Sequence, residues 1–412
     1  MKSTASNEDI GQEQSYSGRY LWVVLFLFIG TELTQALLRM GLPVLYPFIQ
    51  NELGLSRGQV GLLTSAFAFG YGASSVPAGW FTDTIGVKQI VVIYMFSMAA
   101  FTLAFPLVNS FTVILVLVAI IAIVSSPVHN AAVRGVMDWF PTKIRASAMS
   151  VNKAGPPIAG TLTAAILPAL ALAIGWRMAA AANGLLILSI VIIFILLYRD
   201  APARIQVEHK FNIFKSGIVF RNRGLMLALI WATTFVGLQF TVMTYFMLFL
   251  IEKLNLSVMM AGSLLAIAQG SSIIARVLWG AASDFIFHGR RIVVLVIIGL
   301  ITVVWMLGAS LLSVEVPRIL LYLMALVIGI STISFQGVTT TLIGEQAPEG
   351  QIGVTVGFFS MVSHASMMVM PPIFGYLVDV TNSYSFGWGV TAVLALVVTL
   401  SLMALGRLPQ RR

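Results

Sequence analysis

Long apolar segments alternate with short polar connections along almost the whole of this chain. A helix needs about 20 predominantly apolar residues to cross the hydrocarbon core of a bilayer, so the pattern predicts twelve membrane-spanning helices. The first six cover residues 21–48, 58–82, 89–108, 111–138, 143–171 and 177–198. The second six cover residues 223–251, 257–283, 291–313, 317–343, 351–378 and 386–406. The fold class that follows is an all-α membrane protein.

The longest polar connection, residues 199–222, lies between the sixth and seventh predicted spans. It is rich in Arg, Lys and Asp, and we interpret it as a cytoplasmic linker between an N-terminal six-helix bundle, 21–198, and a C-terminal six-helix bundle, 223–406. Residues 1–20 and 407–412 are polar tails. The first tail lacks the basic, apolar and small-residue regions of a signal peptide, which predicts that it stays in the cytoplasm.

Composition agrees with a chain whose solvent is lipid. Of its 412 residues, 58% are hydrophobic and 9% are charged, whereas soluble domains carry about 25% charged residues. The chain has no cysteine, which excludes disulfides, thiolate metal sites and cysteine nucleophiles. No cofactor or metal is expected.

The net charge of +9 reflects topology. With both termini in the cytoplasm, sixteen of the 24 Lys and Arg residues fall on the cytoplasmic side and four on the outer side. This distribution satisfies the positive-inside rule. It predicts a multi-pass protein of a bacterial inner membrane. The expected partner is the lipid bilayer, and no binding of nucleic acid is expected.

An internal repeat supports two related halves. A unit of loop and helix recurs at a constant offset of 201 residues. The matched pairs are Leu53 with Leu254, Ser56 with Ser257, Gly61 with Gly262, Gly79 with Gly280 and Asp83 with Asp284. Such duplication is typical of transporters built from structural repeats and predicts two pseudo-symmetric six-helix bundles.

The segment Gly79-Trp-Phe-Thr-Asp83-Thr-Ile-Gly86-Val-Lys88 resembles the loop signature of the major facilitator superfamily. It departs from the signature at Thr84 and Gln89, where basic residues are usual. The resemblance implies a secondary transporter that works by alternating access. We expect Gly79 to permit close helix contact, Asp83 to accept hydrogen bonds from a neighbouring helix N-terminus and Gly86 to form a tight turn. The predicted conformational gate comprises Gly79, Asp83, Gly86, Lys88, Arg134, Asp138, Asp284 and Arg290.

Ionisable residues inside the predicted spans indicate where function lies, because a charge at mid-bilayer costs about 2.5–3.5 kcal/mol even on insertion scales. Away from the span ends, spans 3, 6, 9 and 12 contain no such residue, which fits a polar cavity surrounded by the other helices. The set is Glu32, Arg39, His129, Arg134, Lys153, Arg276 and His364. Three cations of the presumed cavity, Arg39, Lys153 and Arg276, face one acid, Glu32. The excess of positive charge favours an anionic substrate.

Arg276 is followed by Gly280 and Asp284, and this R-x-x-x-G-x-x-x-D segment resembles the eighth helix of oxalate and monocarboxylate transporters. There the arginine binds the substrate carboxylate, so the resemblance implies a small organic anion. Ser272 replaces the aspartate of the monocarboxylate group. His364 lies near the place of a cavity lysine in the oxalate carriers.

We therefore predict two groups of site residues. The substrate-binding group is Arg39, Arg276, His364, Lys153, Gln239, Tyr245 and Gln269. The proton-coupling group is Glu32, His364 and His129, because carboxyl and imidazole groups can take up a proton near neutral pH when their surroundings shift them. The structural alternatives are helix-packing arginines and hydrogen-bonded packing histidines.

The predicted function is secondary active transport of a small organic anion by a monomer. The anion is a mono- or dicarboxylate, a sulfonate or a sugar acid, moved in symport with a proton. Anion exchange without a proton is an alternative. A drug/proton antiporter is another, because Gly155-Pro156-Pro157-Ile-Ala-Gly160 partly resembles a motif of such exporters, although it lacks the second glycine. No H-E-x-x-H helix or G-x-S-x-G elbow indicates an enzyme.

Overall fold

The structure, a computed structural model, describes residues 18–140, 144, 148–149, 155–200, 223–347 and 352–406. Lys153 lies outside the described residues. Gly79 and Asp83 lie in a helix, but their side chains are also outside what the structure describes.

Helices account for the architecture of both halves. The N-terminal half contains α1 (Gly18–Leu53), α2 (Arg57–Ile85), α3 (Val87–Leu103), α4 (Phe111–Trp139), α6 (Gly155–Ile174) and α7 (Trp176–Leu197). The C-terminal half contains α8 (Arg223–Glu252), α9 (Val258–Ala281), α10 (Arg291–Leu311), α11 (Arg318–Ile328), α12 (Gln336–Gln346), α13 (Ile352–Thr381) and α14 (Tyr384–Gly406). Two π-helical turns, η3 (Ala282–Ile286) and η4 (Gly329–Ile333), interrupt this half.

Eleven segments of the described chain are long and apolar enough to cross a membrane, with α11, η4 and α12 counted as one. The remaining long helix, α2, has 29 residues and packs against α4 and α13. These twelve segments confirm the predicted all-α membrane fold. Of the fifth predicted span, the continuous described helix is α6, so most of residues 143–154 lies outside the described part.

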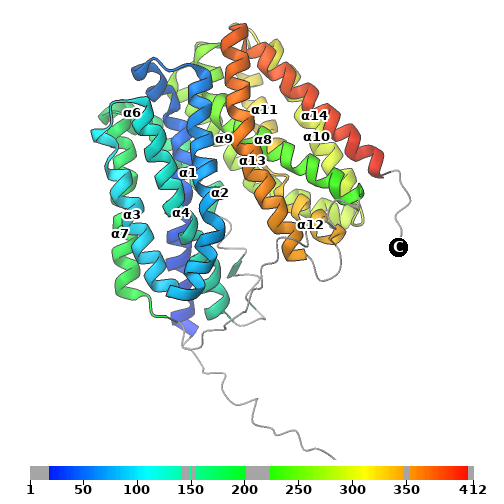
Figure 1. The fold of residues 1–412 in the computed structure, drawn as a ribbon. Helices are drawn as coiled ribbons and strands as arrows, with labels where there is room; N and C mark the ends of the chain where they lie inside the picture. Colours follow the sequence, from blue (N-terminus) through cyan, green and yellow to red (C-terminus); the bar gives the residue numbers. More distant parts are fainter. Residues whose placement is uncertain are drawn as a thin grey trace, which may run out of the picture.

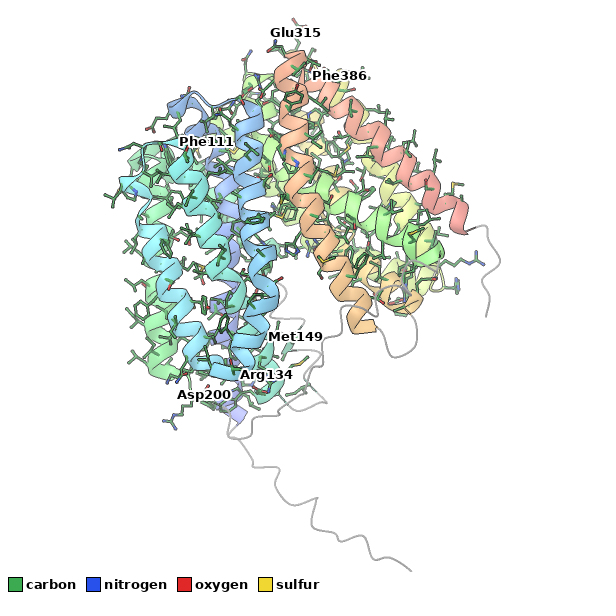
Figure 2. The ribbon with its side chains drawn as sticks, viewed as in Figure 1. Phe111, Arg134, Met149, Asp200, Glu315 and Phe386 are labelled. Carbon is green, nitrogen blue, oxygen red and sulfur yellow. The ribbon has the colours of Figure 1, made fainter. Side chains whose placement is uncertain are left out.

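The two bundles meet at one end and diverge toward the other (Figure 1). Contacts between the halves run along α2 with α13, α6 with α9 and α1 with α8. We call the end where α2 begins and α13 ends the closed end. The opposite end, which carries Arg134 and Asp200 (Figure 2), is called the linker end.

Each half has its own aromatic core. In the N-terminal half, Phe194 and Tyr198 stack with ring centroids 4.5 Å apart, and Phe28 packs against both. In the C-terminal half, Trp231 and Phe235 stack at 3.9 Å. Aromatic pairs of this kind add stability beyond their buried area, so each bundle has packing interactions of its own.

The sequence repeat corresponds to a repeated local structure. Ser56 caps the N-terminus of α2 by accepting a hydrogen bond from the Gln59 amide, and Ser257 caps α9 in the same way. The residues two positions before these caps, Gly54 and Asn255, both have positive φ angles, of 63° and 53°. Glycine and asparagine tolerate this conformation best, so the two copies share one turn.

Small residues allow the halves to approach closely along two seams. In the α2–α13 seam, a Cβ atom placed on Gly61 would lie 2.5 Å from the Cα of Pro372. In the α6–α9 seam, a Cβ atom on Gly262 would lie 2.8 Å from the carbonyl oxygen of Ala164. Without a hydrophobic force between helices in lipid, such close packing of small residues is the main source of attraction.

The tenth span is a broken helix. Its middle, η4, exposes carbonyl groups that regular α-helical bonding does not use, and neighbouring helices supply donors to them. The indole Nε1 of Trp279 donates to the carbonyl of Ile330 at 2.6 Å, and Nη2 of Arg276 donates to the carbonyl of Ile333 at 3.2 Å. Interrupted helices of this kind often mark functional sites.

We predict that Gly61→Ala destabilises the protein, because its added methyl group would collide with backbone atoms of Pro372 that cannot move aside. Overpacking of this kind costs about 1–3 kcal/mol. Gly308→Ala is the matched control, since nothing lies within 4 Å of a Cβ atom there. Thermal unfolding in detergent should show a lower melting temperature for Gly61→Ala alone. Equal melting temperatures would contradict the close approach of α2 and α13.

Candidate functional site

Two arginines from opposite halves form the centre of the candidate site. Arg39 lies on α1 and Arg276 on α9, and their guanidinium groups are close enough for electrostatic repulsion. The Nε atom of each is buried without a hydrogen-bond partner. Neither arginine forms an ion pair with any residue that the structure describes. A buried N–H group without an acceptor is costly, and neither guanidinium has a described counter-ion, so this pair is suited to receive an anion.

An acid on α1 and a histidine on α4 form a buried pair. Nδ1 of His129 on α4 lies 2.6 Å from Oε1 of Glu32 on α1, and the Glu32 side chain is only 2% exposed. One turn further along α1, Gln35 donates to the carbonyl of Ser125 at 2.6 Å. The structure therefore joins two of the three predicted proton-coupling residues in one contact between α1 and α4.

His364, the third predicted proton-coupling residue, lies on α13 and contacts the other half. Its Nδ1 is 2.7 Å from the carbonyl of Ser360, which it reaches by donating a hydrogen bond. Its ring stacks on Tyr71 of α2, with centroids 5.4 Å apart and planes 9° from parallel. Arg39 and His129 are both within electrostatic range of its ring. Sequence reasoning did not select Tyr71, because a tyrosine in an apolar helix gives no signal that separates it from a packing residue.

The predicted glutamines occupy two different places. Nε2 of Gln336, at the start of α12, donates to Oε1 of Gln239 on α8 at 3.1 Å. Gln336 comes three residues after Ile333, the last residue of η4, whose carbonyl accepts a hydrogen bond from Arg276. The amide pair therefore belongs to the same region as the arginine. Gln269 instead lies in the α6–α9 seam, where its amide packs over Gly160.

Tyr245 is also placed in a seam. Its side chain is fully buried, and its hydroxyl donates to the carbonyl of Arg57 at 2.7 Å at the closed end. Its neighbour Thr244 is buried as well and shares a hydrogen bond of 2.9 Å with Thr64. The structure thus places Tyr245 between the halves and not beside the two arginines.

At the linker end, the predicted gate residues make local contacts. Arg134 and Asp138 form an ion pair one turn apart on α4, at 3.0 Å. Gly86 has a φ of 105° between α2 and α3, which confirms the predicted turn, and the amide of Lys88 donates to Asp200 at 3.2 Å. The gate role of these residues remains a prediction.

In the second copy of the loop, the partner of Asp284 is Arg291. Arg291 also forms an ion pair with Glu345 of α12 at 3.3 Å. Arg290, which the sequence predicted as a gate residue, is exposed. The adjacent basic residue thus takes the position in the charge network that sequence analysis gave to Arg290. The two arginines are neighbours, and the sequence alone carries no signal that distinguishes them.

The closed end carries a polar contact that sequence analysis missed. The carboxylate of Asp379, near the end of α13, accepts hydrogen bonds from the amides of Arg57 and Gly58 at 3.0 and 2.7 Å. These amides belong to the first turn of α2, where free N–H groups and the helix dipole favour an anion. The Arg57 side chain pairs with Glu252 of α8 at 2.7 Å, and Tyr384 donates to the same carboxylate at 3.0 Å. We call this set of five residues the latch.

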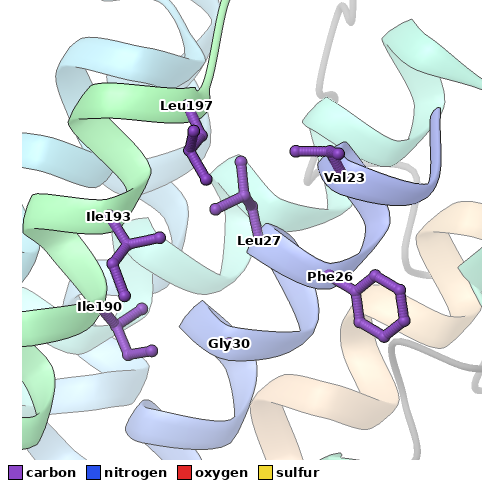
Figure 3. A pocket seen from close by; sticks show the side chains of 7 residues that line it. All are labelled: Val23, Phe26, Leu27, Gly30, Ile190, Ile193 and Leu197. Carbon is purple, nitrogen blue, oxygen red and sulfur yellow. The ribbon is translucent and has the colours of Figure 1, made fainter. Parts of the chain in front are cut away.

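A small hollow between α1 and α7 has a different character (Figure 3). It has a volume of about 300 Å³ and is lined only by glycine and apolar side chains: Val23, Phe26, Leu27, Gly30, Ile190, Ile193 and Leu197. Its lining residue nearest to Arg39 on α1 is Gly30, nine residues earlier, which is about 13 Å along a helix axis. Without polar groups it cannot hold an anion.

Comparison with known proteins identifies related sequences over most of the chain. The family model described as Major Facilitator Superfamily matches residues 27–364. The hexuronate transporter of Bacillus subtilis (strain 168) is 22% identical, over 94% of this chain and 95% of that protein. The probable galactarate/D-glucarate transporter GudP of Escherichia coli (strain K12) is 23% identical, over 98% and 96%. The probable sulfoacetate transporter SauU of Cupriavidus necator is 26% identical, over 40% and 38%.

Solved structures share the fold. A bacterial homolog of the human lysosomal transporter Spinster, in an inward-facing and occupied conformation, has a TM-score of 0.78 at 17% identity, over 95% of this chain and 97% of that chain. The nucleoside transporter NupG has a TM-score of 0.76 at 13% identity, over 93% and 99%. At these identities the likeness concerns the fold alone.

We predict that Asp379→Asn loosens the closed end, because an amide is a weaker acceptor than a carboxylate for the helix N-terminus and for Arg57. The natural absence of cysteine permits a single reporter, Thr64→Cys, at a buried position between the halves. Labelling of this thiol by a membrane-impermeant maleimide should become about threefold to tenfold faster, since the lost interactions are worth roughly 1 kcal/mol.

Glu52→Gln serves as the control for this measurement. Glu52 also forms an ion pair with an arginine, Arg177, but both partners belong to the N-terminal half. Unchanged labelling in Asp379→Asn, or equal acceleration in the two variants, would contradict a latch between the halves.

Proposed function

Because the chain belongs to the Major Facilitator Superfamily, we propose that it is a secondary active transporter of a small organic anion. Family and fold are those of membrane transporters and not of enzymes. The single observation that carries the choice of an anion is the pair Arg39 and Arg276. Each has a buried Nε atom without a partner, and the two come from opposite halves. A guanidinium offers a planar fork that matches carboxylate and sulfonate groups.

The related proteins support this substrate class. Their names specify hexuronate, galactarate/D-glucarate and sulfoacetate, and each of these substrates carries a carboxylate, a sulfonate or both. A drug/proton antiporter for cations fits the region less well, because a cation would be repelled by both arginines. The substrate in this proposal is therefore an organic acid of small size.

Orientation follows from the distribution of basic residues in the sequence. Sixteen Lys and Arg residues fall on the side of the termini and the linker, which places the linker end in the cytoplasm of a bacterial inner membrane. The closed end then faces the outside, and the conformation is inward-facing. In the proposed cycle of a monomer, the latch opens, an anion reaches the two arginines, and the halves rock about it.

We assign proton coupling to the pair of Glu32 and His129. Nδ1 of His129 and Oε1 of Glu32 lie 2.6 Å apart, and Glu32 shares α1 with Arg39, about two turns away. A proton gained by the pair adds one positive charge next to the anion site. That charge strengthens anion binding, and loss of the proton weakens it. Symport follows from this linkage, because each ligand improves the binding of the other.

Replacing Arg276 by Lys should abolish most uptake while the protein is still made and folded. An ammonium group retains the charge but cannot form a bidentate fork, and one hydrogen bond between charged groups is worth about 1.5–3 kcal/mol, or roughly tenfold or more in affinity. The measurement is uptake of labelled galactarate by purified protein in liposomes. Arg318→Lys, at an exposed arginine, is the control. Uptake equal to that of the unaltered protein would end the proposal.

Replacing Glu32 by Gln should separate transport from the proton gradient. The amide cannot take up the coupling proton, so uptake should no longer rise with an inward proton gradient, while exchange of internal for external anion continues. Glu315→Gln changes an exposed loop carboxylate and should leave the response intact. If Glu32→Gln still responds fully to the gradient, another group carries the proton. If the unaltered protein shows no response at all, the carrier is an anion exchanger.

A further inference from the structure

The carboxylates of the described helices are nearly all committed to partners away from the two central arginines. Apart from Glu32, the described helices contain six carboxylates with described side chains, and each is bound to an arginine near one end of the bundle: Glu52, Asp138, Glu252, Asp284, Glu345 and Asp379. Glu32 is bound to His129. No carboxylate among the described residues is therefore left as a counter-ion for Arg39 or Arg276.

Among the described ionisable groups of the central region, the charges add up to plus two. The pair of Glu32 and His129 is neutral when it exists as the ion pair that its geometry allows. Arg39 and Arg276 then contribute two positive charges that repel one another. Like charges in a medium of low dielectric destabilise one another strongly, and removal of each charge from water adds to that cost. Among the described residues, a ligand of charge minus two therefore matches the two guanidinium charges.

Hydrogen-bond geometry also favours a ligand with two anionic groups. A carboxylate has two oxygens, and a bidentate contact with one guanidinium uses both of them. Two guanidinium groups with unpartnered Nε atoms, one on α1 and one on α9, therefore require two anionic groups. A single carboxylate would leave one of the arginines without its full set of acceptors.

We propose that the transported anion is a small dianion, either a dicarboxylate or a sulfonate that also carries a carboxylate, with one anionic group on Arg39 and the other on Arg276. This inference rests on the proposed function and specifies the charge of its substrate. Because its two anionic groups bind arginines of different halves, a dianion bridges the two halves. A monoanion leaves one buried guanidinium uncompensated whenever the site closes against water, so it is selected against during translocation as well as during binding.

The test compares anions that differ in charge and little else. Purified protein in liposomes is supplied with labelled galactarate, and galactonate, sulfoacetate, glycolate, succinate and butyrate compete. Galactarate and galactonate have the same six-carbon backbone, but only galactarate has a carboxylate at each end. Sulfoacetate and succinate are dianions at pH 7.5, whereas glycolate and butyrate are monoanions. The same six compounds are also tested directly as substrates.

We expect the dianion of each transported pair to be preferred by about tenfold or more. Arg39→Gln and Arg276→Gln should each reduce the preference to about twofold or less, because one of the two anionic groups then loses its guanidinium partner. Arg318→Gln should retain the full preference, since it removes an exposed arginine elsewhere. The comparison of anions on the unaltered protein decides the matter even if one of the central variants does not fold.

Two failures can be distinguished. Equal or better transport of the monoanion in the transported pairs would overturn the dianion assignment and leave anion transport intact. Failure of all six anions to be transported or to compete, with protein shown to be folded by gel filtration, would overturn the proposed function itself.

Discussion

A chain in hydrocarbon must satisfy its own backbone hydrogen bonds, because the lipid offers neither donors nor acceptors. The interrupted tenth span shows how this constraint shapes the C-terminal half. Carbonyl groups freed by the π-helical turn η4 accept from Trp279 and Arg276 of α9, and Thr332 within η4 accepts from Trp305 of α10. The break is therefore stable only because neighbouring helices present donors to it. One of those donors, Arg276, is also the residue to which we assign substrate binding.

The same constraint governs charge. Most ionic side chains of the described helices lie near helix ends and are paired there, and only a few lie deep in the bundle. Of those few, Glu32 is bound to His129, and the two arginines have no counter-ion among the described residues. A membrane protein retains such groups only where they bind or move something. The contrast between paired and unpaired charges is what distinguishes the site from its surroundings.

The sequence predicts the spans and the all-α membrane fold well, because length and hydropathy depend on the bilayer alone. Contacts between the halves were less accessible. Helices in lipid are apolar on nearly every face, so no periodic pattern shows which face meets protein. Tyr245 and Gln269 were therefore expected beside the substrate but lie in the seams. The latch joins Arg57 to Asp379 across 321 intervening residues, and no local sequence motif predicts a contact of this kind.

The first turn of α2 depends on a residue from the other half for two of its hydrogen bonds. When the halves separate, water takes the place of Asp379, so the exchange changes the free energy by only about 0.5–1.5 kcal/mol per bond. These two hydrogen bonds therefore add little to the free-energy difference between the closed and open forms. The latch can therefore close the outer end of the bundle and still open readily. The binding free energy of a single solute is large enough to shift an equilibrium of this size.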